Sequence, residues 1–235
     1  MTNIDRTAAV AAFRPSIHTS AVLHQLLLQG DRLRGARVLD IGCGSGVLLE
    51  AAAERGAQSV FGVDVEAAAI DETQRLLSAF GKGVAVETAV GHLYGPVAGR
   101  RFDLVLANLP QFPMRAASVD GRLPSWSDGG DDGRRLLGPM VAGLGQHLAA
   151  GGCAIVAHNA FTGLEETRRL AAAQGLVPEI VDTVMIPLAP EKLAWMTPAV
   201  LDREAGRTIH RFGGHVFAEL VVLLIQAPGG RERGI

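Results

Sequence analysis

The chain has 235 residues, of which 48% are hydrophobic, and a formal net charge of −2. This length supports one substantial core, the apolar content excludes a disordered chain, and the charge argues against general nucleic-acid binding. Two cysteines are too few for a secretory disulfide framework. The first residues lack the apolar core of a signal peptide, and no apolar run is long enough to span a bilayer. We therefore expect a cytoplasmic protein without membrane contacts.

In chain order, the first predicted element is a helix over residues 20–29, which carries leucines on one side and stops at Gly30. It belongs to an expected helical cap segment over residues 1–35. From residue 36 onward, apolar strands alternate with helices, which predicts an α/β fold with a parallel sheet covered on both faces. The predicted strands cover residues 37–40, 59–64, 84–88, 102–107, 153–158, 177–186 and 216–226, and the helices between them cover 47–55, 66–80, 134–149 and 164–174.

Two long stretches interrupt this alternation, residues 109–133 and 187–214, and each contains three prolines. Loops of this length are uncommon in compact domains unless they serve a function. Both should lie over the carboxyl edge of the sheet, where ligands of parallel sheets bind. We therefore expect one binding domain over residues 36–235, with an insertion over 187–214.

The run over residues 38–46, Val-Leu-Asp-Ile-Gly-Cys-Gly-Ser-Gly, is the most informative part of the chain. A strand ends at Asp40, and Gly42, Gly44 and Gly46 then lead into a helix. Glycine lets the backbone turn sharply and approach a ligand, and the N–H groups at a helix start favour polar or anionic groups. The third glycine comes one residue earlier than in the dinucleotide fingerprint, so a nicotinamide dehydrogenase is a less favoured alternative.

A second acidic residue, Asp64, ends the next predicted strand. A carboxylate there can accept hydrogen bonds from both hydroxyls of a ribose, and its alternative role is to cap the following helix. The glycine run, with Asp40 ahead of it, resembles motif I of the class I S-adenosylmethionine-dependent methyltransferases. The resemblance implies a Rossmann-like, doubly wound sheet of seven strands, mostly parallel with an antiparallel last strand. It also implies S-adenosylmethionine as the cofactor and Asp64 as the residue that holds its ribose.

The strand predicted over residues 102–107 leads into Asn108-Leu109-Pro110-Gln111-Phe112. This position resembles motif IV of the methyltransferases that modify planar nitrogens, whose pattern is Asn or Asp, Pro, Pro and an aromatic residue. A side-chain carbonyl and the next backbone carbonyl can each accept one N–H and aim the nitrogen lone pair at the methyl group. We therefore expect catalytic roles for Asn108, Leu109 and Pro110. Leu109 and Gln111 depart from the pattern, and Phe112 supplies a ring one residue late.

Further segments support the same branch, which resembles the release-factor glutamine methyltransferases. Residues 129–133, Gly-Gly-Asp-Asp-Gly, match a segment of those enzymes, with a helix cap as the alternative. The resemblance implies that the residues contacting the cofactor are Thr19, Asp40, Gly42, Gly44, Gly46, Asp64, Val65, His92, Leu93 and Asn108. The expected substrate-binding residues are Gln111, Phe112 and His158. No group of His, Cys, Asp and Glu has metal-ligand spacing, so we expect no metal.

These features predict a transferase that moves a methyl group from S-adenosylmethionine to an amide or amine nitrogen of a protein side chain or a small metabolite. One alternative is an O- or C-methyltransferase of a natural product, which would need a base such as His18 or His158. A second alternative is a SAM-binding module without catalysis, because Leu109 and Gln111 replace motif residues. We expect a monomer or a homodimer, with no general nucleic-acid binding.

Overall fold

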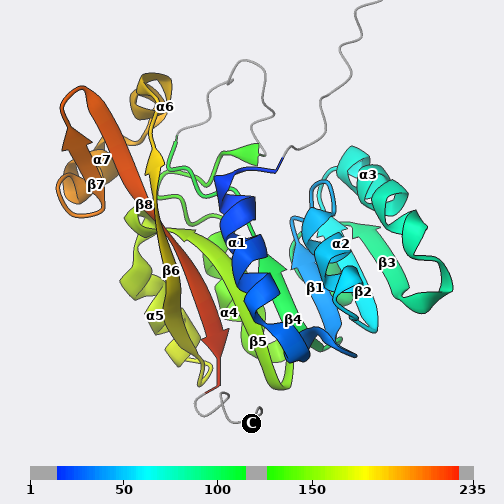
Figure 1. The fold of residues 1–235 in the computed structure, drawn as a ribbon. Coiled ribbons are helices and arrows are strands. Elements are labelled where there is room, and N and C mark those ends of the chain that lie inside the picture. Colours follow the sequence, from blue (N-terminus) through cyan, green and yellow to red (C-terminus); the bar gives the residue numbers. More distant parts are fainter. Residues whose placement is uncertain (1–14, 115–125, 228–235) are drawn as a thin grey trace, which may run out of the picture.

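The computed structural model describes residues 15–114 and 126–227 (Figure 1). Its strands are β1 Arg37–Ile41, β2 Ser59–Asp64, β3 Ala85–Val90, β4 Phe102–Ala107, β5 Leu148–Asn159, β6 Val177–Pro187, β7 Ile209–Phe212 and β8 His215–Gln226. Its α-helices are α1 Ile17–Leu28, α2 Val47–Glu54, α3 Ala67–Leu77, α4 Leu137–His147, α5 Leu164–Ala172, α6 Pro190–Trp195 and α7 Pro198–Glu204. Residues 1–14 of the predicted cap segment and 115–125 of the first long stretch lie outside the described residues.

The strands form one sheet in the order β3-β2-β1-β4-β5-β8-β6. Neighbouring strands from β3 to β5 are parallel, whereas β8 runs antiparallel to both β5 and β6. The expected α/β fold with an antiparallel last strand is therefore confirmed, with the last strand inserted between two others. The chain reverses direction across the sheet between β1 and β4, which is where a doubly wound sheet binds its ligand.

Helices cover both faces of the sheet (Figure 1). Successive side chains of a strand point to opposite faces, so Val38 faces the core under α1 and α2, whereas Leu39 faces the core under α4. Both residues are fully buried. Burial on two faces explains why the parallel strands are continuous apolar runs in the sequence.

Residues 187–214 are more ordered than the sequence indicated. They contain α6, α7 and β7, and β7 forms a hairpin with β8, which makes eight strands instead of seven. Pro190 and Pro198, two of the three prolines in this stretch, stand in the first turns of α6 and α7. Proline is well tolerated there because the N–H groups of a first turn have no partner within the helix.

The first helix also begins earlier than predicted, at Ile17 instead of residue 20. Ser16 and Thr19 form a reciprocal capping box at its start, which satisfies two N–H groups that would otherwise lack partners. No helix within residues 15–114 and 126–227 has the length and apolar character required to cross a lipid bilayer.

Candidate functional site

The carboxyl ends of β1, β2, β4 and β5 meet at one edge of the sheet, and the loop after β1 forms the first part of the site. Gly42, Gly44 and Gly46 all have positive φ angles, of 76°, 54° and 80°. A Cβ atom on Gly46 would lie 2.9 Å from Cγ2 of Thr73, so only glycine lets α2 approach α3 this closely. A Cβ atom on Gly42 would lie 3.0 Å from Cδ2 of Leu109. The glycine turns therefore bring the loop after β1 against the loop after β4.

Asp64 holds the glycine loop in place. Its Oδ2 accepts a hydrogen bond from the N–H of Gly44 at 3.0 Å, and its Oδ1 accepts one from the N–H of Glu66 at 3.0 Å. Burial raises the pKa of Asp64, and these two backbone hydrogen bonds oppose that shift. The residue at the N-cap of α3 is Glu66, so Asp64 is not the helix cap. Each carboxylate oxygen keeps lone-pair capacity for a ligand.

Asp40 is buried beneath the glycine loop. It is 1% exposed, and neither of its carboxylate oxygens has a hydrogen-bond partner among residues 15–114 and 126–227. Burial, with a smaller contribution from the charge of Asp64, raises the pKa of Asp40 to about 8. Asp40 does not line the cavity described next, so the direct cofactor contact expected for it does not fit this arrangement.

A cleft of about 890 Å³ opens beside the glycine loop. Seven residues predicted to bind the cofactor line it, namely Gly42, Gly44, Asp64, Val65, His92, Leu93 and Asn108, whereas Thr19 and Gly46 do not. Val65 is 53% exposed, which leaves an apolar side chain at the rim. Leu93 has φ 47°, a left-handed conformation that costs energy in a non-glycine residue and often marks a functional segment.

A second cavity, of about 660 Å³, adjoins the first. Asn108, Leu109, Pro110 and Trp126 line both, so the Asn-Leu-Pro corner separates the two spaces. The walls of the second cavity include polar side chains from distant parts of the chain, namely Ser16, His18, Gln111, Ser127, Asn159 and Lys192. A cofactor and an acceptor in these two cavities would meet at Asn108.

The orientation of Asn108 is set by α1. Its Nδ2 donates a hydrogen bond to Oγ1 of Thr19 at 3.1 Å, and among the described residues its Oδ1 has no partner. Thr19 therefore acts through Asn108 and not, as we expected, as a wall of the cofactor cavity. The amide oxygen of Asn108 is left to accept a hydrogen bond from a ligand.

Gln111 was predicted to bind substrate, but both polar atoms of its side chain are used inside the protein. Its Nε2 donates to the carbonyl of Ala157 at 2.7 Å, and its Oε1 accepts from the N–H of Asn159 at 3.1 Å. Gln111 thus joins the loop after β4 to β5. Phe112, also predicted to bind substrate, lines the second cavity and packs edge to face against Phe161 with ring centroids 6.4 Å apart.

His158 does not fit its predicted roles as a substrate-binding residue or a base. It is fully buried, and its ring nitrogens are bonded to the carbonyl of Asn159 and to Oγ1 of Thr167, each at 2.9 Å. Burial, assisted by the charge of Arg134, lowers the pKa of His158 to about 4. The neutral ring supports the layer between β5 and α5 and lines neither cavity.

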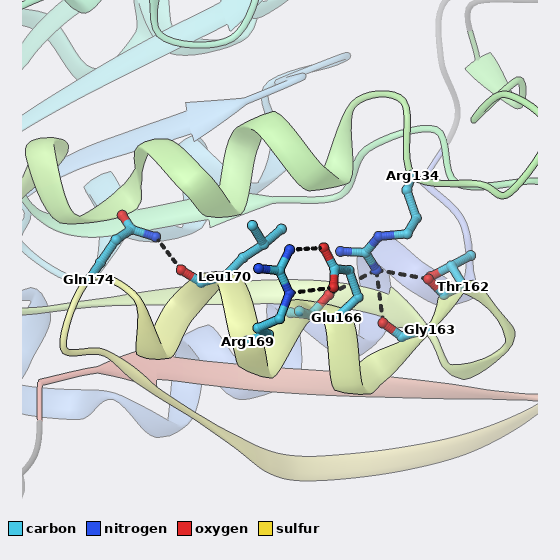
Figure 2. Close-up of polar contacts among 8 residues, drawn as sticks. Arg134, Thr162, Gly163, Glu166, Arg169, Leu170 and Gln174 are labelled. Carbon is cyan, nitrogen blue, oxygen red and sulfur yellow. Dashed lines mark hydrogen bonds and ion pairs between the residues drawn. The ribbon is translucent and has the colours of Figure 1, made fainter.

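The segment over residues 129–133 packs against the loop after β4. Gly133 has φ 80°, and a Cβ atom there would lie 2.5 Å from the carbonyl oxygen of Gln111. Arg134 then donates hydrogen bonds to the carbonyls of Thr162 and Gly163 at 2.8 and 2.9 Å, beside the start of α5 (Figure 2). Helix α4 begins only at Leu137, so this segment is neither its cap nor a wall of the two cavities.

Several residues of the site were not singled out from the sequence. Trp126 lines both cavities, and its Nε1 donates a hydrogen bond to Oε1 of Glu66 at 2.9 Å. Asn159 lines the second cavity at the end of β5, one residue beyond the predicted end of that strand. The same strand-end rule that selected Asn108 could have found Asn159. Trp126 does not follow a predicted strand, so the same rule does not select it.

Comparisons with known proteins agree with this arrangement. A family described as "Methyltransferase domain" matches residues 38–119. The release factor glutamine methyltransferase of Xylella fastidiosa Temecula1 is 33% identical over 180 residues, which are 74% of this chain and 65% of that protein. A Methanocaldococcus jannaschii protein named "putative protein N5-glutamine methyltransferase" is 30% identical over 175 residues, covering 74% of this chain and 87% of that protein.

Solved structures show the same fold at low identity. The ribosomal protein L11 methylase of Lactobacillus delbrueckii subsp. bulgaricus has a TM-score of 0.53 and 17% identity, with 89% of this chain and 80% of that chain covered. The Mtq2–Trm112 complex of E. cuniculi, responsible for methylation of the eRF1 translation termination factor, has a TM-score of 0.58 and 15% identity, with coverages of 92% and 98%.

The structure thus combines a Rossmann-like sheet with a glycine-rich turn, a carboxylate at the end of β2 and an Asn-Leu-Pro corner between two cavities. The chain belongs to the class I S-adenosylmethionine-dependent methyltransferases, in the branch of the protein glutamine methyltransferases. The expected family and its enzymatic nature are thereby confirmed. The dehydrogenase, natural-product and non-catalytic alternatives are not favoured.

Proposed function

We propose that this chain transfers the methyl group of S-adenosylmethionine to the side-chain amide nitrogen of a glutamine in a protein. The observation that carries this proposal is the position of Asn108 between two cavities, with its amide oriented by Thr19. The names of the relatives from Xylella fastidiosa and Methanocaldococcus jannaschii support the acceptor class. Because release factors act in translation, we also propose that the reaction takes place in the cytoplasm.

The residues around the first cavity suit S-adenosylmethionine. Asp64 lines this cavity with a carboxylate that can accept hydrogen bonds from ribose hydroxyls. Val65 and Leu93 offer apolar surface for an adenine ring, and the glycine loop allows close approach of the backbone. The cofactor supplies an electrophilic methyl group on a sulfonium sulfur.

The residues around the second cavity suit an amide. An amide nitrogen is a poor nucleophile because its lone pair is delocalised into the carbonyl group. Oδ1 of Asn108 and the carbonyl of Leu109 can each accept one N–H of a primary amide, which fixes the nitrogen and turns its lone pair toward the first cavity. Pro110 has no N–H and a fixed φ, which helps to hold this corner. After transfer, one N–H proton must leave the nitrogen, and the open second cavity gives it a route to water.

Incubation with a bacterial release factor and S-adenosylmethionine, followed by mass spectrometry of peptides, tests the proposal. We expect one added methyl group on a glutamine residue. Asn108→Ala should lower kcat strongly while leaving the affinity for S-adenosylhomocysteine within a few-fold of wild type. Methylation of another residue type, or full activity of Asn108→Ala, would contradict the proposal.

A further inference from the structure

The second cavity contains a polar side chain that the proposed methyl transfer does not yet use. Asn159 is the last residue of β5 and lies at the same edge of the sheet as Asn108, which follows β4. It is 6% exposed and lines the second cavity together with His18. A buried amide has a defined number of donors and acceptors, so each can be traced to a partner.

The backbone of Asn159 is fixed on both sides. Its N–H donates to Oε1 of Gln111 at 3.1 Å. Its carbonyl oxygen accepts one hydrogen bond from Oγ1 of Thr162 at 2.8 Å and another from Nδ1 of His158 at 2.9 Å. These contacts come from the loop after β4, the turn after β5 and β5 itself. The Cα–Cβ direction of Asn159 is therefore well defined.

The side chain of Asn159 is fixed at its oxygen. Nε2 of His18, from the first turn of α1, lies 2.9 Å from Oδ1 of Asn159. An amide oxygen only accepts, so the imidazole donates from Nε2. The remaining group is Nδ2, which makes no hydrogen bond within the described part of the chain. Its two N–H donors are left for a group inside the cavity, and an unpartnered buried donor is costly.

We propose that Nδ2 of Asn159 donates a hydrogen bond to the carbonyl oxygen of the acceptor amide, and that His18 is the positioning residue that turns this donor toward the cavity. The inference rests on the proposed function and assigns a specificity role at the same site. A primary amide has two N–H donors and one carbonyl acceptor. Asn108 and Leu109 match the donors, and Asn159 matches the acceptor.

This arrangement selects amides over amines and apolar side chains. An amine of similar length could satisfy Asn108 but would leave the donor of the buried Asn159 without a partner from the acceptor. Sites built to hydrogen-bond a ligand group discriminate against analogues that lack it, because the protein group is then left buried and unpaired. The pair of His18 and Asn159 would therefore decide which side chain is methylated.

A binding experiment tests the contact without turnover. Protein labelled with ¹⁵N is saturated with S-adenosylhomocysteine and titrated with the peptide acetyl-Gly-Ala-Gln-Ala-Gly-amide, or the same peptide with ornithine or leucine in place of glutamine. The side-chain amide resonance of Asn159 is identified by its absence in Asn159→Asp. We expect it to shift with the glutamine peptide only. An equal shift with the ornithine peptide, or no shift with the glutamine peptide, would overturn the inference.

Kinetics with a release factor as acceptor give a second, independent readout. We expect Asn159→Asp to raise the KM for the acceptor by about tenfold to a hundredfold, because a carboxylate repels a carbonyl oxygen and lacks the donor. His18→Ala should raise the same KM, and His18→Gln should restore it, since glutamine can also donate from its Nε2. The control is His24→Ala, an exposed residue of the same helix that pairs with Asp182 and should leave the KM unchanged.

The two experiments separate this inference from the proposed function. If the glutamine peptide shifts the Asn159 resonance but no release factor is methylated, the proposed acceptor is wrong and the contact stands. If the release factor is methylated with the same KM by wild type and Asn159→Asp, the function stands and the role of Asn159 is wrong.

Discussion

Oγ1 of Thr19 accepts a hydrogen bond from Nδ2 of Asn108 at 3.1 Å, between residues 89 positions apart in the chain. The same oxygen accepts the N–H of Ser16 at 3.2 Å as part of the capping box of α1. The start of the first helix and the orientation of the Asn108 amide are therefore coupled through one hydroxyl group. A rigid support of this kind is what a reaction that depends on positioning requires.

Replacement of Thr19 tests this coupling. Thr19→Val keeps the shape of the side chain but removes the acceptor, so the amide of Asn108 can rotate out of its productive orientation. We expect kcat to fall about tenfold, a loss of about 1.4 kcal/mol in transition-state stabilisation, with unchanged affinity for S-adenosylhomocysteine. Calorimetry and turnover measurements provide the comparison. Thr19→Ser keeps the hydroxyl and should retain activity; a Val variant as active as the Ser variant would show that the coupling is irrelevant.

Asp64 is expected to control cofactor affinity. Asp64→Asn keeps the shape of the side chain but loses the charge and replaces one acceptor oxygen by an NH2 group, so the hydrogen bonds from the N–H groups of Gly44 and Glu66 cannot both be kept and less acceptor capacity is left for the ribose hydroxyls. The Kd for S-adenosylhomocysteine should rise by about tenfold to a hundredfold, as measured by calorimetry. Asp31→Asn, an exposed position in the turn after α1, is a matched control that should bind normally. Unchanged binding by the Asp64 variant would remove this residue from the site.

The buried carboxyl of Asp40 predicts an unusual pH dependence of stability. An unfolded Asp titrates near pH 4 and the folded one at about 8, so between these values the folded state holds a proton that the unfolded state has lost. Its contribution therefore favours folding at low pH and is lost as pH rises through this window. Asp40→Asn resembles the protonated form. Without cofactor, we expect the variant to match wild type only below about pH 4 and to become steadily more stable than wild type, by urea unfolding, as the pH rises toward 8.

The titration of His158 changes the stability of the folded state in the opposite direction to that of Asp40. The pH dependence of wild type alone therefore does not isolate the effect of Asp40, and wild type must be compared with Asp40→Asn. Its pKa is lowered to about 4 in the folded protein, so below its ordinary value near 6.5 the unfolded state binds the extra proton. Stability from His158 is present above this range and falls as the solution is acidified. Because both proteins contain His158, its effect cancels in the difference between wild type and Asp40→Asn. A difference that stays constant from pH 5 to pH 8 would show that Asp40 does not titrate in this range.

Trp126 offers an optical signal for the site. Its ring lines both cavities, and the chain has one other tryptophan, Trp195 of α6. Binding of S-adenosylhomocysteine should change the polarity around Trp126 and thus its fluorescence. We expect Trp126→Phe to abolish the change and Trp195→Phe to keep it. A signal that persists in Trp126→Phe would place the ligand away from this wall.

The sequence alone determined the features that depend on neighbouring residues. The spacing of Gly42, Gly44 and Gly46 predicted the turn after β1, and apolar runs predicted where β2 and β4 end. Since parallel strands end at one edge, Asp64 and Asn108, which the sequence placed at or just after strand ends, line the same cavity. The resemblance to the methyltransferases then supplied the fold and the cofactor, and the comparisons confirm that family.

Only the tertiary structure decided which of the polar residues face the cavities. Asp40, Gln111 and His158 had suitable types and positions, yet the structure buries or pairs their side chains within the protein. The bond of His18 to Asn159 joins residues 141 positions apart. The direction of a side chain depends on its rotamer and on the partners that packing brings near, and neither is encoded in the local pattern of the chain.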